Sequence, residues 1–149
     1  KYVFETKRIA ELIESATENK YKAADTYKKI ADNTSDSEQE AVVRSIYNEE
    51  IKNIELLKEL YTDITGSNFD NADTEFNIEL DFGNMSEIFK TMCKAEIESA
   101  GLFRDMAEIT KDMPDNFSET LLVIMNDEQN HSVLDNLMFT ECIFNENKE

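Results

Sequence analysis

The chain has 149 residues, 40% hydrophobic and 32% charged, so it is long enough to form one domain with a buried core. Its 33 acidic and 15 basic side chains give a net charge of −18, which argues against binding to nucleic acid or to an anionic membrane surface. No apolar run approaches the roughly 20 residues that span a bilayer, and no signal peptide is visible, so we expect a cytoplasmic protein.

Long helices are the expected secondary structure. Only three glycines and one proline interrupt the chain. Four segments place apolar residues at spacings of three and four, the period of one helix face. We predict helices over about 6–32, 37–65, 85–112 and 118–144, all within a single domain, 1–149. Ser37 with Glu40 suggests a capping box at the start of the second helix. Gly66 suits its end, and Asn84 suits the start of the third helix.

The connections predict how these helices are arranged. The links 33–36 and 113–117 are short, so the first two and the last two helices should each form an antiparallel hairpin. The link 66–84 can reach about 60 Å, whereas a helix of about 27 residues is about 40 Å long. It can therefore cross the bundle and start the third helix parallel to the second. We predict an all-α, ferritin-like four-helix bundle, in which one long crossover loop joins two antiparallel hairpins.

Each predicted helix carries charged or polar residues on its apolar face. In chain order they are Lys20, then Glu50 and Asn53, then Glu96, and finally Glu128 and His131. Burial of such groups costs free energy unless opposite charges or a metal ion meet them. Glu-x-x-His on facing helices is the pattern with which four-helix bundles build metal sites in their cores. We therefore expect the carboxylates and the only histidine of the chain to face one another.

On these residues the chain resembles the rubrerythrin-like branch of the ferritin-like superfamily. The similar segments are Lys20–Ala31, Glu50–Tyr61, Glu96–Ala107 and Asp127–His131, within a resemblance that covers about 8–140. In the family's first helix a ligand Glu stands seven residues before a Tyr, here Tyr27. Phe103 takes the place of the usual Tyr in the third helix. The last segment matches the family's second Glu-x-x-His closely.

The resemblance implies a metal site that has lost one half. The family holds two irons with four Glu and two His. Four of these positions are kept, namely Glu50, Glu96, Glu128 and His131. Lys20 stands where the first-helix Glu belongs, and Asn53 stands where the second-helix His belongs. Both departures fall on the ligands of the same iron in the family, so one half-site is implied to be degenerate and the other complete.

The summed charge of the site residues also suits one metal ion rather than two. Four carboxylates balance two divalent ions, whereas three carboxylates and one ammonium leave a charge that one divalent ion balances. Our hypothesis is that the Lys20 ammonium takes the place of the missing metal and pairs with Glu50 and Glu128. The retained ligands would then hold one Fe, Mn or Zn ion.

Three functions stay open at this point. The first is a metal-binding protein with one ion and weak or no peroxidase activity, because the family reduces peroxide or oxygen with two irons. The second is a working di-iron oxidoreductase, which needs Glu14 or Glu18 to replace Lys20 as a ligand. The third is a metal-free structural or interaction protein whose buried charges satisfy one another.

The two cysteines, Cys93 and Cys142, are too far apart for the CxxC pair of a rubredoxin-type iron site. They are either buried thiols or partners in a disulfide. Since such an iron site is the family's usual built-in entry for electrons, the resemblance leaves room for a separate electron donor. It also leaves room for a homodimer.

Overall fold

The computed structural model describes residues 2–70, 76 and 78–148. Over these residues the chain forms four helices and no strand, which confirms the all-helical prediction. The helices are α1 (Tyr2–Asn33), α2 (Ser37–Thr65), α3 (Met85–Ile109) and α4 (Phe117–Glu146). α2 has the predicted range, α1 begins four residues early, and α3 ends three residues before the predicted end. No helix in the described part of the chain is long and apolar enough to cross a membrane.

The cap of α2 differs from the predicted one. The Asp36 carboxylate accepts hydrogen bonds from the backbone N–H groups of Glu38 and Gln39, at 2.9 and 3.0 Å. Ser37 is instead the first helical residue, so the predicted capping box of Ser37 with Glu40 is wrong. Aspartate is as good an N-cap as serine, and its charge also favours the positive end of the helix dipole.

The other predicted ends follow from local hydrogen bonds. Gly66 ends α2 in the left-handed conformation, with φ of 73°, and its N–H donates to Thr62 O. The Asn84 side chain accepts a hydrogen bond from the N–H of Glu87 and caps α3. α3 stops at Thr110, whose hydroxyl donates to a backbone carbonyl of the preceding turn.

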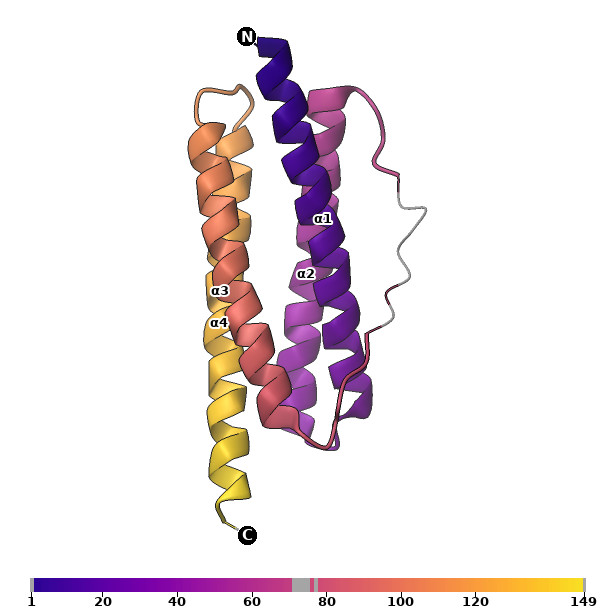
Figure 1. Cartoon of the computed structure of the whole chain (residues 1–149), viewed down its shortest axis with the longest axis vertical. Coiled ribbons are helices and arrows are strands. Elements are labelled where there is room, and N and C mark those ends of the chain that lie inside the picture. Colours follow the sequence, from indigo (N-terminus) through magenta and orange to yellow (C-terminus); the bar gives the residue numbers. More distant parts are fainter. Residues whose placement is uncertain (1, 71–75, 77, 149) are drawn as a thin grey trace.

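The four helices form two antiparallel hairpins that lie side by side (Figure 1). α1 with α2 makes one hairpin, and α3 with α4 makes the other. α2 ends at the end of the bundle opposite to the start of α3, so these two helices run in the same direction (Figure 1). The link between them includes residues 71–75 and 77, which lie outside the described residues. The crossover loop and the ferritin-like assignment therefore stay predictions.

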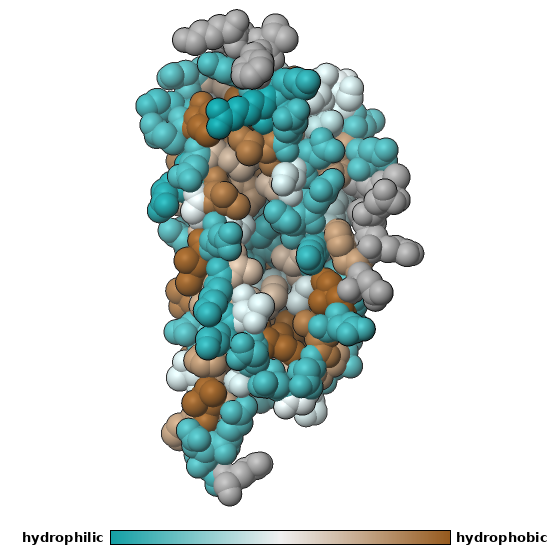
Figure 2. Space-filling view, in the orientation of Figure 1, coloured by the Kyte–Doolittle hydropathy of each residue, from teal (hydrophilic) through white to brown (hydrophobic). Residues whose placement is uncertain are grey.

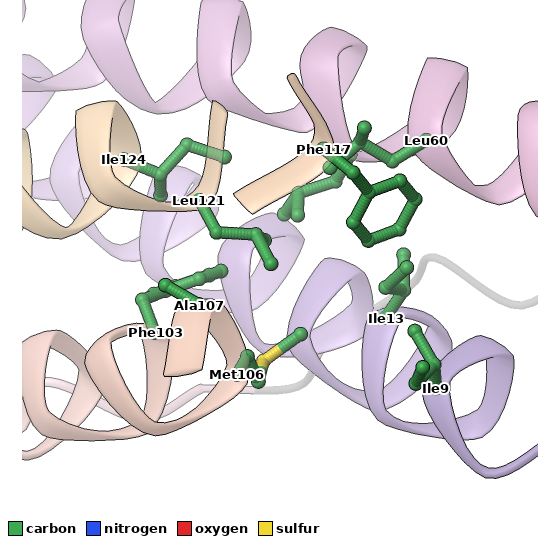
Figure 3. Close-up of a cluster of buried hydrophobic side chains, with 10 residues drawn as sticks. Ile9, Ile13, Leu60, Phe103, Met106, Ala107, Phe117, Leu121 and Ile124 are labelled. Atoms are coloured by element: carbon green, nitrogen blue, oxygen red, sulfur yellow. The ribbon is translucent and has the colours of Figure 1, made fainter. Parts of the chain in front are cut away.

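Two apolar clusters fill the bundle. The Phe103 cluster draws on all four helices and contains Ile9, Ile13, Leu57, Leu60, Phe103, Met106, Ala107, Phe117, Leu121 and Ile124 (Figure 3). The Phe89 cluster contains Tyr27, Ile30, Ala31, Val43, Ile46, Ile88, Phe89, Met92, Met138 and Cys142. In every helix the buried charged residues fall between the members of these two clusters. A polar layer is thus enclosed by apolar side chains on both sides, and water is excluded from it.

Both cysteines are free thiols, which excludes the disulfide alternative. Cys142 is buried in the Phe89 cluster, and its sulfur lies 3.3 Å from Gln39 Nε2. Cys93 is half-buried, and its thiol lies 3.4 Å from the carbonyl oxygen of Ser132.

Candidate metal centre

Four side chains from three helices meet in the polar layer. Glu50, Glu96, Glu128 and His131 are each at most 2% exposed, and one ligand atom from each lies within 4.8 Å of the others. Glu50 belongs to α2 and Glu96 to α3. Glu128 and His131 are three residues apart on α4, a spacing that puts them on one face of the helix. The predicted site residues are therefore together, close enough to hold a metal ion.

α1 contributes a cation to the same layer. Lys20 is 3% exposed, and its Nζ lies 3.0 Å from Glu50 Oε2, 2.5 Å from Glu128 Oε2 and 3.9 Å from Glu96 Oε2. Burial alone would lower the pKa of Lys20, but the field of these carboxylates raises that pKa above its usual value. Lys20 is therefore an ammonium ion with carboxylates on several sides.

His131 has a different neighbour at each ring nitrogen. Nδ1 points into the layer, 2.9 Å from Glu50 Oε1 and 3.7 Å from Glu96 Oε2. Nε2 points outward, 2.8 Å from Glu49 Oε2. Burial opposes a charge on the ring, yet the bonds to Glu50 and Glu96 raise the pKa of His131 to about 11. In the absence of a metal ion, the imidazole is therefore protonated on both nitrogens.

The pKa values of Glu96 and Glu128 are shifted in opposite directions. Burial and the hydrogen bond between the two groups raise the pKa of Glu128. Burial also acts to raise the pKa of Glu96, but hydrogen bonds from Glu128 and His131 outweigh it and lower that pKa. Two carboxylates this close in a low-dielectric core do not both ionise readily. Of these two groups, Glu128 is therefore the one whose protonated form is favoured.

Protons alone can make the layer neutral. The two positive charges of Lys20 and His131 then balance the three carboxyl groups of the cluster once one of them, Glu128, carries a proton. One divalent ion that displaces the protons of Glu128 and His131 leaves the net charge unchanged. A second divalent ion would add two uncompensated charges in the core, at a high electrostatic cost. The layer is matched in charge to one ion.

Several atoms in the layer have at most ion-pair neighbours among the described residues, without a hydrogen bond of good geometry. They are both carboxylate oxygens of Glu50, Oε2 of Glu96, Oε1 of Glu128 and Nδ1 of His131. Buried polar atoms without hydrogen bonds are rare in folded proteins, because each loses its hydration. Here they are the carboxylate oxygens and imidazole nitrogen that Fe, Mn and Zn take as ligands. The donor set therefore fits a divalent transition metal.

Comparison of the chain with protein-family models, curated proteins and solved structures finds no match. The resemblance to the rubrerythrin-like branch therefore stays a prediction from the sequence. What the protein does is inferred from the polar layer and its surroundings.

Asn53 forms its side-chain hydrogen bond with a residue outside the cluster. It is fully buried, and its Nδ2 donates to Asp127 Oδ2 at 3.2 Å. Glu14 and Glu18, the replacement ligands that a di-iron site would need, are exposed on α1. In the structure it is Lys20, not either glutamate, that α1 directs into the layer.

Sequence reasoning missed the polar residue next to the layer. The Tyr27 hydroxyl lies 2.6 Å from Asp135 Oδ2 and 3.0 Å from Glu96 Oε1, so it bridges Asp135 to the cluster. Asp135 is fully buried, and burial raises its pKa to about 8. Leu134, the residue before it, is only half-buried.

The signal that could have found Asp135 is the spacing of the inner face of α4. Its buried residues are Leu121, Ile124, Glu128, His131, Asp135, Met138 and Cys142, at steps of three and four in strict alternation. Such alternation keeps residues on one side of a long helix. Glu49 gave no comparable signal, because a half-exposed glutamate on a helix is ordinary.

A surface groove lies beside the layer, between α1 and α3. It has a volume of about 470 Å³, and both Lys20 and Glu96 contribute to its walls. Ala23 of α1, Met92 of α3 and Leu80 of the preceding link make much of the remaining wall apolar. The groove therefore borders the layer at Lys20 and Glu96, although each of these side chains is at most 3% exposed.

Proposed function

We propose that this protein binds one divalent metal ion in the bundle core, and that it is a rubrerythrin-like member of the ferritin-like superfamily with a degenerate second half-site. The ligands are Glu50, Glu96, Glu128 and His131. The observation that carries the proposal is the convergence of these four buried side chains, with one ligand atom of each within 4.8 Å of the others.

The position of Lys20 supports the loss of one ion. Its ammonium contacts Glu50 and Glu128, which correspond to the two bridging carboxylates of the resembled family. A cation there neutralises the oxygens that a second metal would share. The common direction of α2 and α3 supports a ferritin-like connection between the hairpins (Figure 1).

The chemistry expected of one ion is limited. Bound iron supplies one-electron redox chemistry, whereas the family's reduction of peroxide draws on two irons. The residues of the chain hold the ion, exclude bulk water between the two apolar clusters, and release the protons of Glu128 and His131 when it binds. We therefore expect weak or no peroxidase activity.

A metal-free structural role is the second candidate, and the neutral protonated layer favours it. Lys20, His131 and the carboxylates can balance one another without an ion, and such a network stabilises a core when its members are satisfied. Both candidates predict a folded protein, so metal stoichiometry has to separate them.

The test is the metal content per chain, after purification and again after anaerobic loading with ferrous iron. We expect about one equivalent by elemental analysis, lost in His131→Ala and retained in Glu119→Gln, which changes an exposed carboxylate on the same helix. Two equivalents with peroxide turnover would support the di-iron oxidoreductase instead. No binding, with unfolding unaffected by chelator, would support the metal-free role.

A further inference from the structure

Lys20 and His131 contact different oxygens of the same carboxylate. Glu50 presents Oε2 to the Lys20 ammonium at 3.0 Å and Oε1 to His131 Nδ1 at 2.9 Å. Glu128 likewise turns Oε2 toward Lys20, at 2.5 Å, and its buried Oε1 has no hydrogen bond of good geometry among the described residues. The oxygens not turned toward Lys20 are therefore left for a metal ion, and the ammonium keeps its place when the ion binds.

Lys20 is shielded from water, although α1 lies at the surface. Its side chain is 3% exposed, and Ala23 of α1, Met92 of α3 and Leu80 of the link form an apolar wall in the groove beside it. Figure 2, which looks onto α1 and α3, shows apolar side chains between the hydrophilic ones of this face. A charge that water does not reach acts on its neighbours through a low effective dielectric constant. Lys20 therefore influences other charges in the layer far more than a surface lysine would.

The acids next to the layer do little to offset this charge. Asp135 reaches the cluster through the Tyr27 hydroxyl, and burial raises the pKa of Asp135 to about 8, so it is neutral at lower pH. Glu49 lies on the outer side of His131, where its side chain is 45% exposed and water screens it. Among the described residues, the unscreened charge beside the ligand atoms is therefore that of Lys20.

The summed charge of the layer distinguishes divalent from trivalent ions. With Lys20 as an ammonium, His131 neutral and the three carboxylates of the cluster ionised, one divalent ion brings the sum to zero. A trivalent ion in the same place leaves one positive charge without a partner in a low-dielectric core, beside an ammonium. Two unit charges about 5 Å apart, at an effective dielectric constant of about 20, change an equilibrium constant by roughly 100-fold.

We propose that Lys20 makes the metal centre selective for divalent over trivalent ions, so that bound iron is held in the ferrous state. This inference rests on the proposed metal site and adds the residue that sets the charge of the ion. Lys20 touches the ligands and not the ion, so it acts through the charge that it adds to the layer. α1 thus supplies, in place of a ligand, the group that decides which oxidation state the centre accepts.

Competition binding with Zn²⁺ and with Ga³⁺, which has the charge of ferric iron but no redox chemistry, tests the selectivity. Both ions are supplied with nitrilotriacetate at about pH 6.5, where Asp135 keeps its proton. We expect Lys20→Met to raise the affinity for Ga³⁺ relative to Zn²⁺ by roughly 100-fold. Lys20→Arg keeps the charge and should keep the wild-type ratio. Lys22→Met removes an exposed ammonium from the same helix and the same groove, so it is the matched control and should also keep the ratio.

The outcomes separate this inference from the metal site on which it rests. A wild type that binds neither ion would overturn both. Zn²⁺ binding with the same ratio of affinities in the wild type and in Lys20→Met would leave the metal site standing and overturn the role of Lys20. Circular dichroism verifies that each variant is folded, and Lys20→Gln replaces Lys20→Met in the comparison if the latter is not.

The reduction potential of bound iron gives a second readout. Anaerobic redox titration, followed by electron paramagnetic resonance of the ferric ion, measures the midpoint potential. We expect this potential to be lower in Lys20→Met than in the wild type by about 120 mV, which is the roughly 100-fold change at about 59 mV per tenfold for one electron. Lys22→Met should keep the wild-type potential. Equal potentials in the wild type and Lys20→Met would overturn the proposal.

Discussion

At the scale of single residues, the two nitrogens of His131 decide how the ring can serve as a ligand. Nε2 lies 2.8 Å from Glu49 Oε2, and Nδ1 faces the carboxylates of the layer. A hydrogen bond from Nε2–H to a carboxylate leaves the Nδ1 lone pair for the metal once the inner proton has gone. Glu49, whose side chain is 45% exposed, thereby selects the ring tautomer from outside the cluster.

The first prediction concerns Glu49. Glu49→Ala should weaken metal binding by about 10- to 100-fold, as is typical for loss of an outer hydrogen bond to a ligating imidazole. Glu49→Gln keeps an acceptor and should lose less. Competition with a chelating dye measures the affinity, and nitrogen NMR of the only histidine reports its tautomer. Glu55→Gln, an exposed position on the same helix, is the control. Unchanged affinity in Glu49→Ala would show that packing alone orients the ring.

At the scale of helices, the two hairpins contribute unequally to the cluster. α3 and α4 supply Glu96, Glu128 and His131 to the cluster. α1 and α2 supply only Glu50 as a ligand, together with the Lys20 cation. Each helix presents its residues to the layer because steps of three and four repeat on one face. Three of the four candidate ligands therefore come from the α3–α4 hairpin, whereas α1 supplies a cation in place of a ligand.

The second prediction is that Lys20→Glu combined with Asn53→His raises ferrous binding from about one to about two equivalents per chain. The combined change removes a cation and adds a carboxylate and an imidazole, which restores both the charge and the ligands for a second ion. Anaerobic titration followed by elemental analysis counts the ions. Lys20→Met removes the charge without adding a ligand, so it should stay at one. A double variant that still takes up one ion would contradict the assignment of the lost half-site to α1 and α2.

At the scale of the whole molecule, the enclosed layer makes stability depend on pH. The folded chain holds protons on His131, with a pKa of about 11, and on Asp135, with a pKa of about 8. Their ordinary values are 6.5 and 3.8. Both pKa values are raised by folding, so the stabilisation from each group is complete below its ordinary pKa and is lost as the pH rises through the folded one. Between about pH 6.5 and 8, the stabilisation from His131 and the stabilisation from Asp135 both decrease as the pH rises.

The third prediction follows from that overlap. With chelator present, the free energy of unfolding should fall as the pH rises from 6.5 to 8, by up to about 1.4 kcal/mol per pH unit for each proton that only the folded state holds. Urea unfolding curves across this range measure the slope. His131→Asn removes one of the titrating groups and should make the slope shallower. A stability that rises with pH in this window would show that the layer does not hold these protons.

The sequence by itself determined the helices and their inner faces. The range of α2, the Gly66 stop and the Asn84 cap follow from local propensity and local hydrogen bonds, which neighbouring residues decide. The three–four spacing also shows that Lys20 and Glu96 point inward, because a helix has one period whatever it packs against. The cap of α2 was predicted less well, since Asp36 and Ser37 are adjacent and both residue types cap helices.

The tertiary structure alone decided which inward-facing groups meet. The contacts of Lys20 with three carboxylates, and of Tyr27 with Asp135, join residues more than 25 positions apart along the chain. A periodic pattern places a side chain on a face, but it does not set the height of one helix against another or the rotamer of a long side chain. Those depend on how the two apolar clusters pack around the layer, and the same packing excludes the water that would otherwise weaken every charge interaction within it.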